Sequence, residues 1–277
     1  MLPEAKSEDL LYIAVFTRPG QHPATEVLVY SYASHQLVGT LKGFKDPQTL
    51  CADTAGNVYI NDQEANAIVV YAHGASKPKA KLPDSAIPYS CSVDPSDGNL
   101  AVANDDNSIF VYQKARGTPK QYDNTRNFWG VSCAYGNSDI LFVQDTLTKG
   151  NYTYKYFPKY GELVKGRKQL RWLRTRKVFD EIGIQVLWDG AYLVASQSFG
   201  LIRYAVVGRA ITVHDTIPLD GEPDEFWLVP KYHQVVAVYD PFVEYFNYPE
   251  GGRRVSMFTV LDGDTTTGMA VSLASSR

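Results

Sequence analysis

Residues 56–75, GNVYINDQEANAIVVYAHGA, contain the pattern that decides the fold of this chain. A Gly-Asn turn is followed by an alternating segment that starts at Val58, then by polar residues, then by a second segment that ends at Tyr71 before another turn. Alternating short segments between turns rich in Gly and Asn are typical of an antiparallel hairpin. One such unit cannot bury its own apolar face, so the pattern predicts an array of similar units.

Two landmarks repeat along the whole chain. The first residue of the strand after the turn recurs at Leu10, Val58, Leu100, Ile140, Tyr192 and Val235. A tyrosine that closes the following strand recurs at Tyr30, Tyr71, Tyr112, Tyr156, Tyr204 and Tyr248. Both landmarks keep a spacing of 40 to 52 residues, which is the length of a blade of four antiparallel strands. Six units predict an all-β, six-bladed β-propeller that occupies residues 1–277 as one domain.

The innermost strand of each blade is predicted from a small or apolar segment just before each turn. These segments are Thr49–Asp53, Ser90–Asp94, Gly130–Tyr135, Ile182–Leu187, Glu225–Val229 and Met269–Leu273. The last of them has no blade after it, and the N-terminal blade has no innermost strand before Leu10. We therefore expect the C-terminal strand to join the N-terminal blade, which closes the ring and removes the open sheet edges.

Composition excludes few functions but indicates several general properties. Of the 277 residues 44% are hydrophobic, and the formal net charge of −3 gives no reason to expect a nucleic acid. Without an apolar run of about 18 residues, no membrane span is expected, and the protein is predicted to be a monomer. The N-terminus lacks the layout of a secretory signal, so the protein is either cytoplasmic or exported with its signal removed. Cys51, Cys91 and Cys133 are interpreted as small buried residues of the inner strands rather than as a disulfide scaffold.

The turn and strand motifs resemble those of a known family. The segments DTAGNVY (53–59) and VYAHGAS (70–76), with a Pro-to-Gly-Asn spacing seen in Pro47–Val58 and Pro88–Leu100, are similar to NHL-repeat six-bladed propellers. They also resemble a group of uncharacterised bacterial propeller proteins. Blades four to six depart from the motif, with Asp189-Gly190-Ala191 in place of Gly-Asn. The resemblance implies a fold and an interaction surface, and it implies no reaction.

Polar residues open the loops that join second and third strands on one face of the disc, and these residues form a candidate ligand face. They are Asp62, Asp105, Asp145 and Asp240, with the aromatic residues Tyr239 and Phe242 in the loop of the last blade. Four carboxylates on one face suit a cation or a basic ligand. Asx residues also open turns by bonding the backbone, and the sequence favours that interpretation. Exposed rings there would suit a sugar or a peptide, although core or rim filling is the commoner use.

The favoured function is therefore non-enzymatic: a binding scaffold that offers its loop face and central channel to a protein, peptide or glycan, with no cofactor. The alternative is a metal-dependent lactone or ester hydrolase, because propellers of similar shape such as the gluconolactonase group hold a divalent metal in the channel. A divalent cation such as Ca²⁺ would then need acids such as Asp46, Glu181 or Glu225, but no family ligand set matches and no metal ligand is assigned. Neither a Gly-x-Ser-x-Gly nor a P-loop motif occurs, and the histidines have no metal-ligand spacing.

A basic segment, Lys155–Lys177, contains nine Lys and Arg residues and one acid, Glu162. The simpler interpretation is an exposed outer strand whose like charges discourage edge pairing. The alternative is a site for an anion such as a phosphate, a polysaccharide or a lipid headgroup. Its candidate residues are Arg167, Lys168, Arg171, Trp172 and Arg174.

Overall fold

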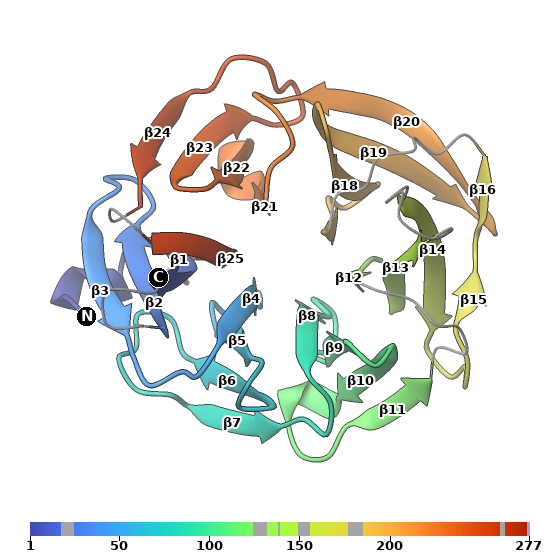
Figure 1. Cartoon of the computed structure of the whole chain (residues 1–277), viewed down its shortest axis with the longest axis horizontal. Coiled ribbons are helices and arrows are strands. Elements are labelled where there is room, and N and C mark those ends of the chain that lie inside the picture. Colours follow the sequence, from blue (N-terminus) through green and yellow to red (C-terminus); the bar gives the residue numbers. More distant parts are fainter. Residues whose placement is uncertain are drawn as a thin grey trace.

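The computed structural model describes residues 1–17, 25–123, 132–137, 139–148, 156–176, 185–260 and 264–275. In this part of the chain six antiparallel sheets are arranged like blades around a central axis (Figure 1). The helical content is limited to three short 3₁₀ turns: η1 (Pro3–Lys6), η2 (Gln113–Ala115) and η3 (Pro230–Tyr232). The prediction of an all-β, six-bladed propeller is confirmed.

The strands are given blade by blade, each blade starting with the strand nearest the axis. Blade 1 contains β25 (Asp264–Ser272), β1 (Leu10–Thr17), β2 (Thr25–Ser31) and β3 (Leu37–Leu41). Blade 2 contains β4 (Pro47–Ala52), β5 (Val58–Asp62), β6 (Ala67–Tyr71) and β7 (Ala80–Pro83). Blade 3 contains β8 (Pro88–Val93), β9 (Leu100–Asn104), β10 (Ser108–Tyr112) and β11 (Lys120–Asp123). Blade 4 contains β12 (Ser132–Tyr135), β13 (Ile140–Thr148), β14 (Tyr156–Val164) and β15 (Arg171–Trp172). Blade 5 contains β17 (Val186–Trp188), β18 (Leu193–Gln197), β19 (Gly200–Val207), β20 (Ala210–Pro218) and β16 (Arg174–Arg176). Blade 6 contains β21 (Glu225–Val229), β22 (Gln234–Tyr239), β23 (Phe242–Asn247) and β24 (Ser256–Thr259).

The ring is closed as predicted. Strand β25 pairs antiparallel with β1, so that Val271 lies opposite Leu11 and Met269 lies opposite Ile13. The C-terminal strand is therefore the innermost strand of the N-terminal blade (Figure 1). With β25 in place, β1 is paired on both sides, by β25 and by β2, so closure leaves this second strand without an open edge.

A second set of contacts fastens this junction. The Nδ1 atom of His73 lies 2.7 Å from the hydroxyl oxygen of Ser272, and its Nε2 atom lies 3.0 Å from the carbonyl oxygen of Glu8. The carboxylate of Asp9 accepts hydrogen bonds from the ammonium of Lys231, at 2.6 Å, and from the backbone N–H of Ala274, at 2.7 Å. Blade 2, blade 6 and both chain ends are thereby tied together.

The hydrophobic core lies between blades. The buried apolar residues of the described chain form six clusters, and each cluster joins the facing sheets of two neighbouring blades. For example, Tyr204 of blade 5 packs against Tyr160 of blade 4, with ring centroids 5.2 Å apart. The alternation seen in the sequence thus sends side chains to two inter-blade cores, which explains why strands such as β5 are buried at every position.

The tyrosine landmark fails in blade 4. Tyr156 begins β14 instead of closing it, because β13 and β14 pair over nine positions, from Ile140 opposite Val164 to Thr148 opposite Tyr156. This long hairpin displaces the tyrosine to the opposite end of its strand. Tyr204 also lies inside β19 rather than at its end. The irregularity of blade 4 extends to its neighbour, since β16 pairs in parallel with β20 and adds a fifth strand to blade 5.

All three cysteines are buried, as predicted, but two of them also form a disulfide, which was not expected. Cys51 of β4 and Cys91 of β8 form a disulfide, with a Cα–Cα distance of 5.8 Å. Neighbouring inner strands converge near the axis, and their relative register, which places these two residues side by side, is not readable from a single blade. Cys133 is a buried free thiol, as predicted, and burial raises its pKa to about 12.

Candidate functional site: the central channel and the upper face

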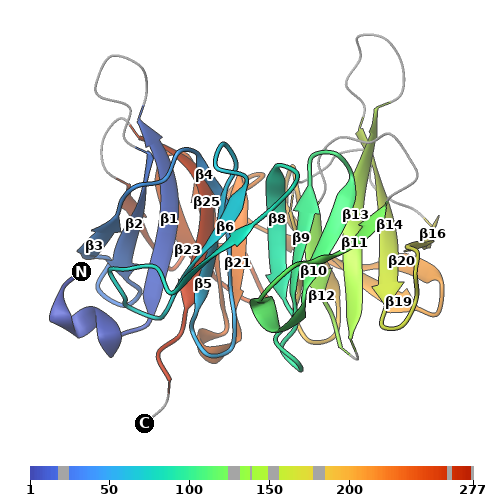
Figure 2. The same ribbon diagram turned by 90° about the horizontal axis from the view of Figure 1, so that it is seen from below.

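The antiparallel order of the strands gives the disc two different faces. Each inner strand starts at the upper face of Figure 2, where second strands also end, and each inner strand runs down toward the face that carries the two chain ends. The upper face therefore contains the loops between second and third strands and the connections between blades. The lower face contains the turns that follow the inner strands.

A cavity of about 100 Å³ occupies the upper part of the channel. All six blades contribute to its lining, mainly through side chains at the start of the inner strands. The polar lining residues are Gln48, Thr49, Gln63, Tyr89, Ser90, Ser132, Gln185, Glu225 and Thr267. Hydroxyl, amide and carboxyl groups thus surround a space large enough for a few water molecules or for one side chain of a partner.

A second cavity, of about 290 Å³, occupies the lower part of the channel and has a largely apolar lining. Cys91, Leu187 and Trp227 line both cavities and therefore form the constriction between them. Trp227 also packs against the core clusters of three blade pairs, which fixes its indole near the axis. The upper cavity consequently has a more polar lining than the lower one.

Glu225 is the most unusual group of the upper cavity. It is the first residue of β21 and is only 6% exposed. Burial, together with the neighbouring carboxylate of Asp224, raises the pKa of Glu225 to about 8. No ion pair to Glu225 is formed within the described part of the chain. A buried carboxyl group that faces a cavity without a cation is a candidate binding residue, since perturbed groups gather at functional sites.

The amides around this cavity are held by the ends of neighbouring strands. The Oε1 atom of Gln185 accepts the backbone N–H of Phe226, at 2.7 Å, and the Nε2 atom of Gln48 donates to Asp46, at 2.6 Å. The Nδ2 atom of Asn61 donates to the hydroxyl of Thr49, at 2.8 Å, while its buried Oδ1 has no hydrogen-bond partner in the described chain. These bonds fix the polar groups in place before any ligand arrives.

Two of the predicted ligand-face carboxylates bond to the backbone. Asp62 is 2% exposed and accepts the N–H groups of Lys45 and Asp46, so it shapes the connection that leads into β4. Asp240 accepts the N–H of Thr266, at 3.1 Å, and joins blade 6 to the inner strand of blade 1. Hydrogen bonding to the backbone is the role that the sequence favours for these aspartates. The N–H groups that they bond belong to other segments, however, rather than to their own turns.

The other two predicted carboxylates behave differently. Asp105 is exposed on the upper face directly after β9. The placement of Asp145 in a loop is wrong, because Asp145 lies inside β13 opposite Lys159. The long β13–β14 hairpin moves the loop farther along the chain. The four carboxylates therefore do not form a common ring, and no pair of them is brought together among the described contacts.

Tyr239 and Phe242 lie opposite each other at the end of β22 and the start of β23, rather than in a loop. A two-residue turn, Asp240-Pro241, joins the strands. The Tyr239 ring is partly buried and its hydroxyl lies 3.4 Å from the carbonyl oxygen of Gly221, whereas Phe242 is 41% exposed on the upper face. Phe242 is therefore the member of this pair that a ligand can reach.

Exposed aromatic rings are concentrated on the upper face. Among the described residues, Phe16, Phe199 and Phe242 are exposed on it, and Phe199, at the tip of the β18–β19 hairpin, reaches 81% exposure. On the lower face Tyr232 is the comparable ring. The isoleucine Ile87, in the connection to blade 3, adds to the upper set. Exposed rings on this face suit contact with a sugar or a peptide.

The basic segment follows the outer edge of blades 4 and 5 (Figure 1), far from the channel. Arg171 forms an ion pair with the buried carboxylate of Glu162, and the backbone of Trp172 accepts a bond from Arg209. The exposed residues Arg167, Lys168 and Arg174 lie on or beside this edge. Lys155, Lys177 and the candidate acid Glu181 lie outside the described residues.

One acidic group was not found by sequence reasoning. Asp94, Asp97 and Asp139 place one carboxylate oxygen each within 4.8 Å of the others, on the lower face between blades 3 and 4. Within the described residues, no such group of His, Cys, Asp or Glu lies in the channel. The sequence does contain a sign of this group. The turn DPSDGN (94–99) has one more acidic residue than the corresponding turn of blade 2, DTAGN.

Comparison with known proteins shows the fold alone. No protein-family model matches the chain, and no curated protein matches it. A functionally unknown protein from Desulfotomaculum acetoxidans DSM 771 superimposes with a TM-score of 0.59 at 12% identity, over 95% of this chain and 84% of the other. A chain of a nidogen/laminin complex superimposes with a TM-score of 0.66 at 11% identity, over 97% of this chain and 99% of the other.

The similarity to NHL-repeat proteins stays a prediction of the sequence motifs. None of the helices in the described ranges is long and apolar enough to cross a membrane.

Proposed function

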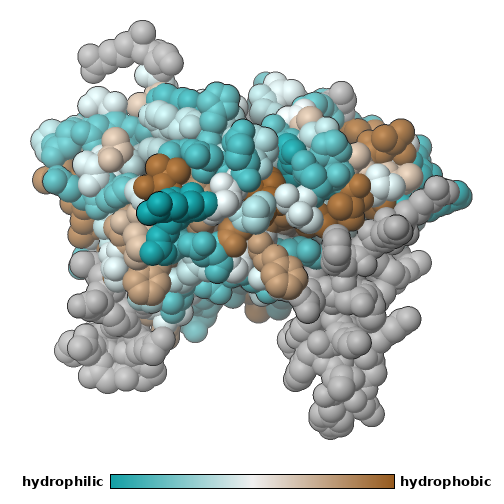
Figure 3. Space-filling model, turned by 90° about the horizontal axis from the view of Figure 1, so that it is seen from above, coloured by the Kyte–Doolittle hydropathy of each residue, from teal (hydrophilic) through white to brown (hydrophobic). Residues whose placement is uncertain are grey.

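We propose that this propeller is a binding scaffold that presents its upper face and the mouth of its channel to a peptide segment of a partner protein. The concentration of exposed aromatic rings on the upper face carries this proposal. Phe199 and Phe242 are large, rigid side chains, and such residues dominate the energy of protein interfaces. The visible outer edge of the disc is mostly hydrophilic, with hydrophobic residues scattered over it (Figure 3), and offers a less continuous surface.

The channel mouth supports a peptide as the ligand. Gln48, Gln185 and Glu225 offer amide and carboxyl groups at the start of the inner strands. Gln185 is held by the backbone N–H of Phe226, and Gln48 is held by the side chain of Asp46. A peptide brings N–H donors and a side chain that fits the small cavity. One similar structure is a nidogen/laminin complex, which is compatible with a propeller that contacts another protein.

The proposal is tested by selecting ligands from a displayed random-peptide library and from a glycan array with the purified protein. The decisive variant is Phe199→Ser/Phe242→Ser. The matched control is Val207→Ser, which removes a side chain that is 75% exposed at the opposite end of β19. Truncation of an anchoring ring costs about 2 kcal/mol, or about 30-fold in affinity.

We expect wild type and Val207→Ser to bind the same peptides, and the double variant to lose at least about tenfold in affinity. Equal binding by all three proteins would place the site elsewhere and contradict the proposal. Selection of glycans alone would replace the peptide with a carbohydrate as the ligand of this face.

The hydrolase alternative needs a different result. Of the channel-lining residues, Glu225 supplies the carboxylate and Gln48, Gln63 and Gln185 supply amides, so a metal there would depend on Glu225. A screen of lactones and esters with and without added Ca²⁺ tests this alternative. Metal-dependent turnover that Glu225→Gln abolishes would favour the enzyme over the scaffold.

The disulfide supports export of the protein. Disulfides such as Cys51–Cys91 persist in oxidising compartments and are rare in the cytosol. We therefore propose an extracytoplasmic location, which cell fractionation of the source organism tests. Recovery of the protein with the cytosolic fraction in reduced form would contradict it.

A further inference from the structure

The first residue after the inner strand is an aspartate in three blades, and two of these aspartates accept hydrogen bonds through both carboxylate oxygens. In blade 2 the Oδ1 atom of Asp53 accepts two backbone N–H groups, and its Oδ2 atom accepts the Asn57 side chain, at 2.7 Å, and the Tyr59 hydroxyl, at 3.0 Å. In blade 5 the Oδ2 atom of Asp189 accepts the Tyr248 hydroxyl, at 2.6 Å. In both blades a tyrosine hydroxyl thus donates a hydrogen bond to the Oδ2 atom of the aspartate.

Asp94 occupies the same position in blade 3, but its Oδ2 atom has no hydrogen-bond partner within the described chain. Its Oδ1 atom accepts the N–H and the hydroxyl of Ser96, while its Oδ2 atom is buried and accepts nothing within the described chain. Ala101 stands where blade 2 has Tyr59. The side chain of Asn99, the counterpart of Asn57, donates to Asp97 instead, because this turn is one residue longer.

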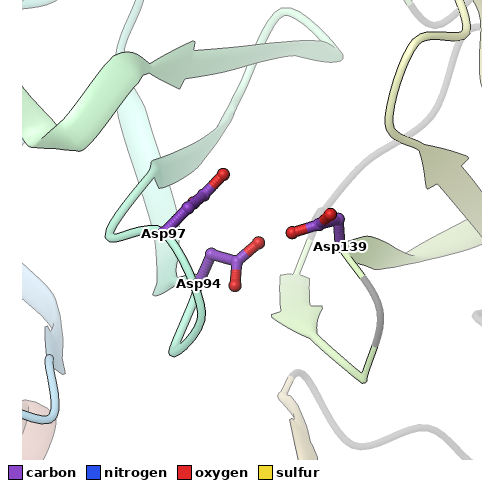
Figure 4. A group of neighbouring side chains, drawn as sticks. All are labelled: Asp94, Asp97 and Asp139. Atoms are coloured by element: carbon purple, nitrogen blue, oxygen red, sulfur yellow. The ribbon is translucent and has the colours of Figure 1, made fainter.

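The carboxyl group of Asp94 lies beside two further carboxylates. Asp97 comes from the same turn and Asp139 from the equivalent turn of blade 4 (Figure 4), and the three ligand atoms lie within 4.8 Å of one another. Asp94 is 2% exposed, so its charge is shielded from water. A buried carboxylate oxygen without a donor costs free energy, and an absent water molecule or ion is its usual explanation.

Among the described residues, one ammonium group approaches these three carboxylates. Lys165 approaches Asp97 and Asp139, at 3.2 and 3.1 Å, and its side chain is 61% exposed. The single hydroxyl hydrogen of Ser96 faces both Asp94, at 2.7 Å, and Asp139, at 2.9 Å, and can bond only one of them. Three carboxylates against one ammonium leave two negative charges, which is the charge that a divalent cation neutralises.

We propose that Asp94, Asp97 and Asp139 bind a calcium ion that links blades 3 and 4 on the lower face. Carboxylate oxygens are the ligands that Ca²⁺ prefers, and Ca²⁺ accepts irregular coordination completed by water, whereas Mg²⁺ demands an octahedron. Because the ligands come from two sheets, the ion stabilises the contact between the blades. When Ca²⁺ is scarce, the exposed ammonium of Lys165 partly neutralises these carboxylates in place of the ion. This site is separate from the channel, so it does not depend on the proposed peptide binding.

The test is calcium titration of the EDTA-treated full chain by calorimetry and by thermal unfolding. We expect one equivalent of Ca²⁺ to bind with Kd of about 10⁻⁴ to 10⁻³ M, as in extracellular modules. A tenfold excess over Kd should raise Tm by about 2–4 °C. Asp94→Asn should abolish both signals. The matched control, Asp53→Asn, alters the equivalent turn of blade 2 and should leave Ca²⁺ binding unchanged.

Lys165→Met separates a cation site from an acidic group that Lys165 simply neutralises. If Ca²⁺ competes with the ammonium, this variant should bind Ca²⁺ about tenfold more tightly than wild type, since one like charge beside the ion is removed. A Lys165→Met protein that is less stable and gains nothing from Ca²⁺ would overturn the proposal. So would the absence of saturable binding to wild type at 10 mM Ca²⁺, about ten times the weakest Kd expected.

Discussion

Reduction of the Cys51–Cys91 disulfide is expected to destabilise the propeller by about 4 kcal/mol. The bond closes a loop with a sequence separation of 40 residues. In the chain-entropy treatment a cross-link over about 40 residues removes roughly 13 cal/mol/K of unfolded-state entropy, which is about 4 kcal/mol at 25 °C. For a chain of this size each kcal/mol corresponds to about 2–4 °C, so Tm should fall by about 8–16 °C.

The assay combines thiol counting with thermal unfolding. The chain has three cysteines, and the structure assigns one of them, Cys133, as a free thiol. In denaturant, the unreduced protein should therefore show one reactive thiol and the reduced protein three. The double variant Cys51→Ala/Cys91→Ala is the control, because its Tm should not respond to reductant. Three reactive thiols before reduction, or a Tm that reduction leaves unchanged, would refute the reasoning.

Three further changes probe other contacts, each by denaturant unfolding. Burial raises the pKa of Glu225 to about 8, above the usual value near 4.5, so the folded state holds the extra proton and stability is lost as pH rises through about 8. Glu225→Gln should remove this loss, with little effect at pH 4; an unchanged pH profile would contradict the burial argument. Burial lowers the pKa of His73, so stability should fall as pH drops below about 6.5, and His73→Gln should flatten that fall. If stability still falls at acid pH in that variant, the contact between His73 and Ser272 is not the cause of the fall. A Cβ at Gly268 would lie 2.0 Å from the carbonyl oxygen of Gln48, so Gly268→Ala should cost about 1–3 kcal/mol, and no loss would show that β25 and β4 can separate.

The parts of the fold that could be predicted are those with a local cause. The Gly-Asn turn before Val58 and the apolar alternation after it specify a hairpin within one blade, and repetition of that signal predicts six blades. Ring closure was also predictable, because Leu10 lacked an inner strand and the segment after Gly268 lacked a blade. In each case the signal is present within a single repeat, although the strands that close the ring come from opposite ends of the chain.

The parts that could not be predicted depend on contacts between blades. The pairing of Cys51 with Cys91 requires the register of two inner strands that share no hairpin, and no pattern within either blade encodes it. The cluster around Asp94 needs the turns of two different blades to meet. The misplacement of Asp145 has another cause: the polar residues Gln144, Asp145 and Thr146 resemble the start of a loop, but β13 continues through them to Thr148.

Many of the contacts that tie blades together lie on the opposite face from the groups that are available to a partner. The contacts of Asp9 and His73, the disulfide and the carboxylates around Asp94 lie in the lower half of the disc. Glu225 and the exposed ring of Phe199 lie in the upper half. Because distant sites contribute nearly additively to stability, removal of the exposed Phe199 ring should alter binding without weakening the lower contacts, and changes to the lower contacts should do the reverse.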